Sequence, residues 1–96
     1  MSIDFTSIRN HNEQAVMLAV AEAAPQHPGL QDNPDLLADV ACVALNRMQP
    51  RYIRHQVDFN FYLSERERNE GAKAVKDAVE FAFGFVQARH AMRARA

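Results

Sequence analysis

Three arginines gather where a helical pattern gives way to an extended one. Arg47 precedes Pro50, while Arg51 and Arg54 follow it on either side of Tyr52. An arginine fork can bind a phosphate group through paired hydrogen bonds, and an aromatic ring beside it can stack on a base. These side chains are therefore a candidate site for a phosphate-bearing ligand. Spacing alone favours a simpler role, in which Arg47 stabilises a helix C-terminus and the other two arginines form the polar face of an edge strand.

The other reactive side chains form no catalytic or metal-binding motif. The four histidines are scattered, and none has the spacing to a second histidine or a cysteine that a metal site requires. Cys42 is the only cysteine, so neither an intrachain disulfide nor a cysteine-based zinc site can form within one subunit. Its place in the middle of a helical pattern is typical of a small packing residue. We expect no enzyme activity, no cofactor and no metal.

Length and charge limit the function classes further. The 96 residues are enough for one small domain, with an N-terminal arm over residues 1–9 and a basic end over residues 88–96. The net charge of −1 gives no overall field that would favour binding to nucleic acid. The N-terminus lacks the pattern of a signal peptide, and no apolar run approaches the roughly 20 residues of a membrane span. We expect a cytoplasmic protein that does not associate with membranes.

The first two helices are marked by their ends. Asn10 is expected to cap the first helix, with Glu13 as its reciprocal partner, and Pro25 to end it. Residues 25–33 have the composition of a loop. Asn33, followed by a proline and an aspartate, predicts the start of the second helix, and Pro50 closes that helix.

An extended segment and a third helix follow. Apolar and polar side chains alternate over residues 51–63, which predicts one long strand or two short ones bent near Asp58. A lone strand leaves backbone groups unpaired, so we expect it to pair with the same segment of a second subunit. Ser64 and Glu67 form a capping box, from which the third helix runs into the late eighties. The fold class is therefore mainly α with a short β segment (α+β), built from three helices and completed by dimerisation.

The third helix carries more apolar surface than a small domain needs. Three phenylalanines lie beside the core positions of this helix. Together they make the apolar arc cover more than half of the helix circumference. We interpret this excess, with a second apolar face on the second helix, as a homodimer interface. The expected interface residues are Phe81, Phe83, Phe85, Val43 and Leu36. The alternative is a third helix buried centrally in the monomer.

Three short motifs in residues 39–53 resemble the signature of the late competence development protein ComFB family. They are Asp-Val at 39–40, Ala-Leu-Asn at 44–46 and Pro-Arg-Tyr at 50–52. The order of the surrounding elements is similar from about Ile8 to Val86. The sequence departs from the family pattern in two places. Residues 30–38 lack the cysteines that bind zinc in some members, so zinc is not carried over, and Gln49-Pro50 replaces a frequent double proline.

The resemblance implies a small homodimeric regulatory protein rather than an enzyme. Members of the family are linked to competence, motility and pili, and some look like receptors for cyclic di-GMP. By position, this implies phosphate and guanine contacts, a stacking surface and polar groups that could read a guanine edge. The phosphate and guanine contacts would come from Arg47, Arg51 and Arg54, and the stacking surface from Tyr52. The polar groups for the guanine edge would be Asp39 and Asn46.

Dimerisation bears on the ligand site and on the alternative function. A two-fold dimer would bring two copies of the Pro50 turn together, so that a two-fold symmetric ligand could meet a two-fold symmetric site. The alternative function is a ligand-independent adaptor that uses its broad apolar surface to bind itself or a regulatory protein partner.

Overall fold

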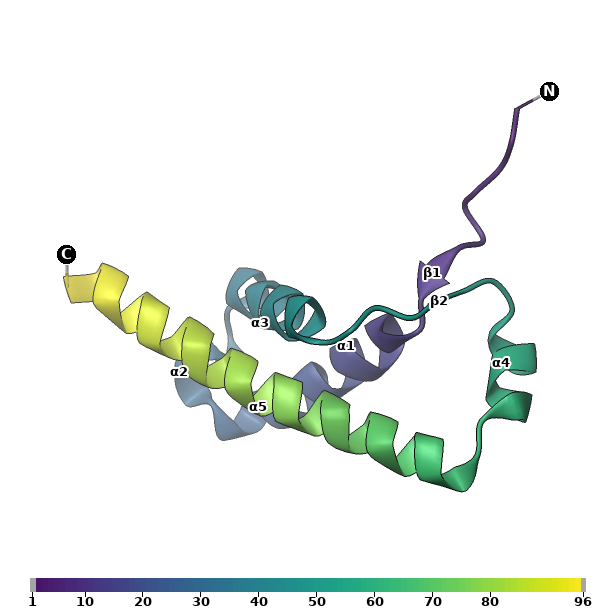
Figure 1. The fold of residues 1–96 in the computed structure, drawn as a ribbon. Coiled ribbons are helices and arrows are strands. Elements are labelled where there is room, and N and C mark those ends of the chain that lie inside the picture. The colour runs from purple at the N-terminus through teal and green to yellow at the C-terminus, as the bar shows by residue number, and fades with distance from the viewer. Residues whose placement is uncertain (1, 96) are drawn as a thin grey trace.

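The protein is mainly helical, with one small antiparallel sheet (Figure 1). The computed structural model describes residues 2–95. In chain order the elements are β1 (Arg9–Asn10), α1 (Asn12–Ala23), the 3-10 turn η1 (Ala24–Gln26), α2 (Pro28–Gln31), α3 (Pro34–Arg47), β2 (Tyr52–Ile53), α4 (Gln56–Tyr62) and α5 (Glu65–Arg95). The α+β class is confirmed, but the described chain has five α-helices rather than three.

The core lies where α1, α3 and α5 pack against one another, with α5 running along the other two (Figure 1). Each of these helices contributes buried residues at helical spacing. The buried members of the cluster are Val16, Val20, Leu30, Val40, Ala44, Ala78, Val79, Ala82, Phe83 and Val86. Burial of such side chains is the main force that holds the three helices together.

Phe83 belongs to this core and not to a subunit surface. Its side chain is only 1% exposed, and its ring stacks on His27 with 4.0 Å between ring centroids. Because it is covered within its own chain, its assignment to the dimer interface was wrong. Phe81 and Phe85 remain 41% and 45% exposed. The apolar arc of α5 is thus divided between the core and an exposed stripe.

Two of the three expected helix starts are confirmed. The Asn33 side chain accepts a hydrogen bond from the Leu36 amide, and Ser64 exchanges hydrogen bonds with Glu67 at 3.1 Å. The start of α1 differs, because His11 rather than Asn10 holds the N-cap position. α5 also continues through the basic end to Arg95.

The extended segment is much shorter than the alternation predicts. β2 pairs with β1 of the same chain, with Arg9 opposite Ile53, so no second subunit is needed to complete this ladder. Residues 56–62 form the helix α4 instead of a strand. Gln56, Phe59 and Leu63 are partly buried whereas the residues between them are exposed, and this spacing is helical.

The region expected to be a loop also contains helix. η1 and α2 occupy most of residues 24–31, and Leu30 within α2 is fully buried. A leucine among prolines and polar residues gives no periodic signal, so the sequence could not show that it enters the core.

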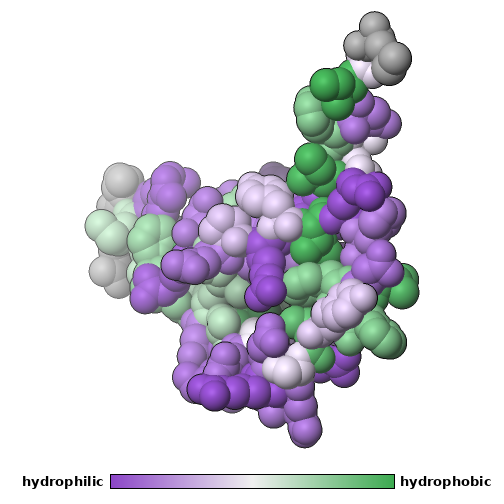
Figure 2. All heavy atoms as spheres, turned by 45° about the vertical axis from the view of Figure 1, so that its right-hand side comes forward, coloured by the Kyte–Doolittle hydropathy of each residue, from purple (hydrophilic) through white to green (hydrophobic). Residues whose placement is uncertain are grey.

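Several large apolar side chains lie outside the core. The arm before β1 projects away from the body of the molecule (Figure 1), and Figure 2 shows hydrophobic side chains along it. The large apolar side chains that are exposed on the arm and on α4 are Ile3, Phe5, Ile8, Val57, Phe61 and Tyr62. In residues 2–95, no helix has both the length and the apolar character to cross a membrane.

Candidate functional site

Arg47 and Arg51, two of the candidate ligand residues, line the same cavity. The cavity measures about 580 Å³ and lies between the end of α3, the turn that follows it and the middle of α5. Its walls include Asn12, Asp77 and Phe81. We call it the turn cavity.

Each arginine of the turn cavity rests on an aromatic ring from another element. The guanidinium carbon of Arg47 lies 3.6 Å from the centroid of Phe81, and that of Arg51 lies 4.8 Å from the centroid of Phe59. Such contacts contribute about 0.5–1 kcal/mol each at exposed sites. A guanidinium group held over a ring in this way can still donate N–H groups to a ligand.

Neither arginine is neutralised by an acid. Among residues 2–94 the ion pairs within 4 Å are Arg66 with Glu70 and Lys73 with Asp77, both on the surface of α5. Two unpaired guanidinium groups at one cavity favour an anionic ligand.

The start of α1 holds the turn in place. The Asn10 side chain accepts hydrogen bonds from the amides of Asn12 and Arg51, both at 3.1 Å, and the Asn12 side chain donates to the Gln49 carbonyl at 3.0 Å. The His11 amide donates to the Arg51 carbonyl at 2.7 Å. The sequence indicates Asn10 as a cap, but its link to a residue 41 positions away is visible only in the fold.

Asp77 is the functional candidate that the sequence interpretation missed. It belongs to the narrow polar side of α5, where a charged residue is normally just solvated. In the structure it lines the turn cavity and accepts a hydrogen bond of 2.9 Å from Lys73. That hydrogen bond and the attraction between the two charges raise the pKa of Lys73. The turn cavity therefore combines two cationic groups with one carboxylate.

Arg51 also borders a second cavity, of about 510 Å³, on the side of α4. His11, Phe59 and Arg68 are among its lining residues, and Arg68 donates to the Asn60 carbonyl at 2.8 Å. Because it touches both cavities, Arg51 is the most central of the predicted ligand residues.

The structure does not bring the remaining candidates to the turn cavity. Tyr52 is 68% exposed on β2, and Arg54 and Asn46 are exposed on either side of the turn. None of the three lines any of the cavities described here. Their proximity in sequence therefore does not make one site.

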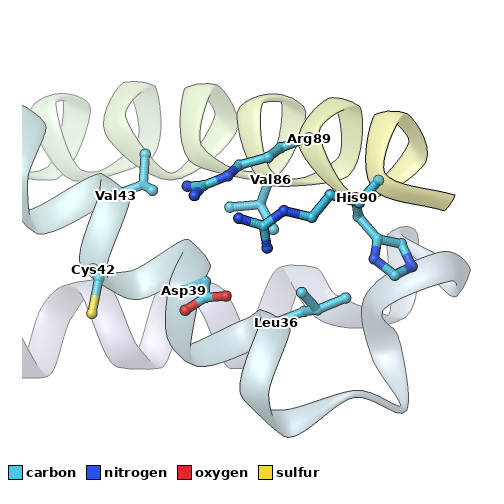
Figure 3. Close-up of a pocket in the computed structure, with 8 residues that line it drawn as sticks. Leu36, Asp39, Cys42, Val43, Val86, Arg89 and His90 are labelled. Carbon is cyan, nitrogen blue, oxygen red and sulfur yellow. The ribbon is translucent and has the colours of Figure 1, made fainter. Parts of the chain in front are cut away.

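Asp39 lies in a different cavity, between α3 and the last turns of α5 (Figure 3). This Asp39 cavity measures about 370 Å³ and is also lined by Arg89, His90 and Arg93, which the sequence assigns to a solvated basic end. In Figure 3 the sulfur of Cys42 points away from Arg89. Within residues 2–95, no three His, Cys, Asp or Glu side chains are grouped so as to hold a metal ion.

Fold and site together define a small, mainly helical α+β domain with arginine-lined cavities between α3 and α5. The family model of the late competence development protein ComFB matches residues 9–90. The chain therefore belongs to the ComFB family and is a small competence-related regulatory protein. No curated protein and no solved structure matches it. The family match includes every residue that lines the turn cavity, but it ends at His90 and so leaves out Arg93 of the Asp39 cavity.

Proposed function

We propose that the protein is a cytoplasmic, dimeric receptor for cyclic di-GMP that passes the signal to a regulatory protein partner, and that it has no catalytic activity. The observation that supports this proposal is the pair of unpaired arginines at the turn cavity, each held on an aromatic ring. Cyclic di-GMP offers two phosphodiester groups and two guanine bases. Arginine N–H groups suit the phosphates, and a carboxylate such as Asp77 can accept the two adjacent N–H groups of a guanine edge.

The exposed stripe on α5 supports a dimer that encloses this site. Phe81 and Phe85 stack with 6.0 Å between centroids, and Phe81 is also the ring beneath Arg47. Val43 and Leu36 on α3 are half-buried. A second copy seated on the stripe would cover apolar surface and exclude water beside the arginines, which strengthens their hold on phosphate.

Calorimetric titration with a panel of cyclic dinucleotides tests the proposal. We expect the wild-type protein to prefer cyclic di-GMP, and Arg51→Ala to weaken binding by about tenfold or more, because a hydrogen bond to a charged group contributes about 1.5–3 kcal/mol. Arg66→Ala is the matched control, since Arg66 is exposed and paired with Glu70. Absence of both heat and thermal stabilisation at high ligand concentration would contradict the proposal.

A second candidate is a ligand-independent adaptor. It is favoured by the apolar side chains on the N-terminal arm and α4, which nothing covers in the single chain. In this case the protein should form its dimer or its complex with a regulator regardless of nucleotides. Light scattering with and without each dinucleotide distinguishes the two candidates.

A further inference from the structure

The Asp39 cavity has the composition of a ligand site of its own. It is bounded by α3 on one side and the last turns of α5 on the other (Figure 3). Arg89 and Arg93 are one helical turn apart, so they line the same side of α5, and both border the cavity. His90 borders it as well.

The charges of this cavity do not balance. Asp39 is the one carboxylate among its lining residues, against two guanidinium groups. Asp39 forms no ion pair within 4 Å with either arginine, and residues 2–94 provide no other acid within that distance of them. The arginines are therefore available for an anion, and Asp39 is available for a hydrogen-bond donor.

Three of the lining residues are apolar, and we call them together the apolar floor. Leu36 and Val43 are half-buried and Val86 is buried, and all three contribute to the lining. An inorganic anion would make no use of this floor, whereas a flat organic group would cover it. The volume of about 370 Å³ is at the lower end of the range for small-ligand sites.

We propose that the Asp39 cavity binds a purine nucleoside monophosphate. A phosphate monoester carries about −1.5 to −2 charges at neutral pH, which matches two guanidinium groups. The base covers Val43 and Val86, and its edge donates to Asp39. Guanine presents two neighbouring N–H donors to a carboxylate and adenine presents only its amino group, so the guanine nucleotide binds more tightly.

This site goes beyond the proposed function, because it uses neither Arg47 nor Arg51. The family match ends at His90, so Arg93 is a contribution of this chain beyond the matched region. The two sites can therefore be tested separately on the same protein.

The test is a calorimetric titration of the full chain with guanosine 5′-monophosphate, adenosine 5′-monophosphate and inorganic phosphate. We expect the guanine nucleotide to bind most tightly. Replacing both arginines (Arg89→Gln, Arg93→Gln) should weaken it by tenfold or more, because both phosphate contacts are lost. Asp39→Asn should weaken the guanine nucleotide but leave inorganic phosphate unchanged.

Matched controls keep the result specific. Arg66→Gln should bind the guanine nucleotide like the wild type, and Arg51→Ala should do so even if it no longer binds cyclic di-GMP. Glutamine has nearly the helix propensity of arginine, so α5 should keep its melting temperature, which circular dichroism checks. Methyl NMR shifts on adding the nucleotide should centre on Val43 and Val86.

Three results would overturn the proposal. The first is an absence of guanine-nucleotide binding by the wild type at millimolar concentration. The second is binding that the double arginine variant does not weaken. The third is inorganic phosphate binding as tightly as the nucleotide, which would leave no role for Asp39 or the apolar floor.

Discussion

At the residue scale, Asn10 connects the fold to the site. Its side-chain oxygen accepts from the amides of Asn12 and Arg51, at 3.1 Å each, so one side chain joins the start of α1 to the turn that carries the ligand-binding arginine. Asn12 contributes to the same junction, because its side chain donates a hydrogen bond to the Gln49 carbonyl.

Replacing this side chain should affect stability and binding together. Asn10→Ala removes the acceptor of two amides, of which one is partly buried. We expect the free energy of unfolding to fall by about 1 kcal/mol and cyclic di-GMP binding to weaken, since the turn is less well held. Urea denaturation and calorimetry measure the two effects. Asn10→Asp keeps the acceptor oxygen and should restore most of the stability, whereas equal loss in both variants would show that the hydrogen bonds contribute little.

At the element scale, the sequence predicts helices with clear ends and periodic stripes but misplaces the segment between them. The caps at Asn33 and Ser64 and the core stripes of α1, α3 and α5 follow from local chemistry. The alternation over residues 51–63 suggests a strand because apolar residues at every second position fit that period. A helix instead directs Phe59 and Leu63 to one side and leaves Val57 and Phe61 exposed. Only tertiary contacts select between these arrangements.

The same reasoning applies to the candidate site. Arg47 and Arg51 flank one turn, so their proximity follows from the sequence. Asp39 and Arg93 are 54 positions apart, and only the packing of α3 against the end of α5 brings them to one cavity. The sequence groups Asp39 with the arginines around Pro50 and leaves Arg89 and Arg93 in a basic end, whereas the fold places Asp39 beside Arg89 and Arg93.

α4 should depend on a single ring. A helix of seven residues is not stable alone in water. Phe59 packs on His11 with 4.4 Å between ring centroids and lies beneath Arg51, whereas Phe61 is 80% exposed. We expect Phe59→Ala to abolish hydrogen-exchange protection across residues 56–62 while α5 stays protected, and Phe61→Ala to leave α4 intact. Protection that survives the loss of Phe59 would show that contacts other than this ring maintain the helix.

At the scale of the whole molecule, apolar side chains are exposed in several places, and two sets of them bear on assembly. One is the stripe of Phe81 and Phe85 beside the turn cavity, and the other is formed by the N-terminal arm and α4. The two regions predict different assemblies. A dimer through the stripe would close over the arginines, whereas one through α4 would leave the turn cavity open to solvent.

The choice between these assemblies can be measured with one pair of variants. If the stripe is the interface, Phe85→Ser should convert a dimer to a monomer in light scattering, because it replaces a half-exposed ring with a small polar group. Phe61→Ser is the matched control on α4 and should leave the dimer unchanged. Cyclic di-GMP should strengthen the wild-type dimer, since a ligand that binds only the assembled form shifts the equilibrium toward it. A wild type that stays monomeric at high concentration, or a dimer that only Phe61→Ser disrupts, would remove the stripe as the interface and with it the enclosed two-fold site.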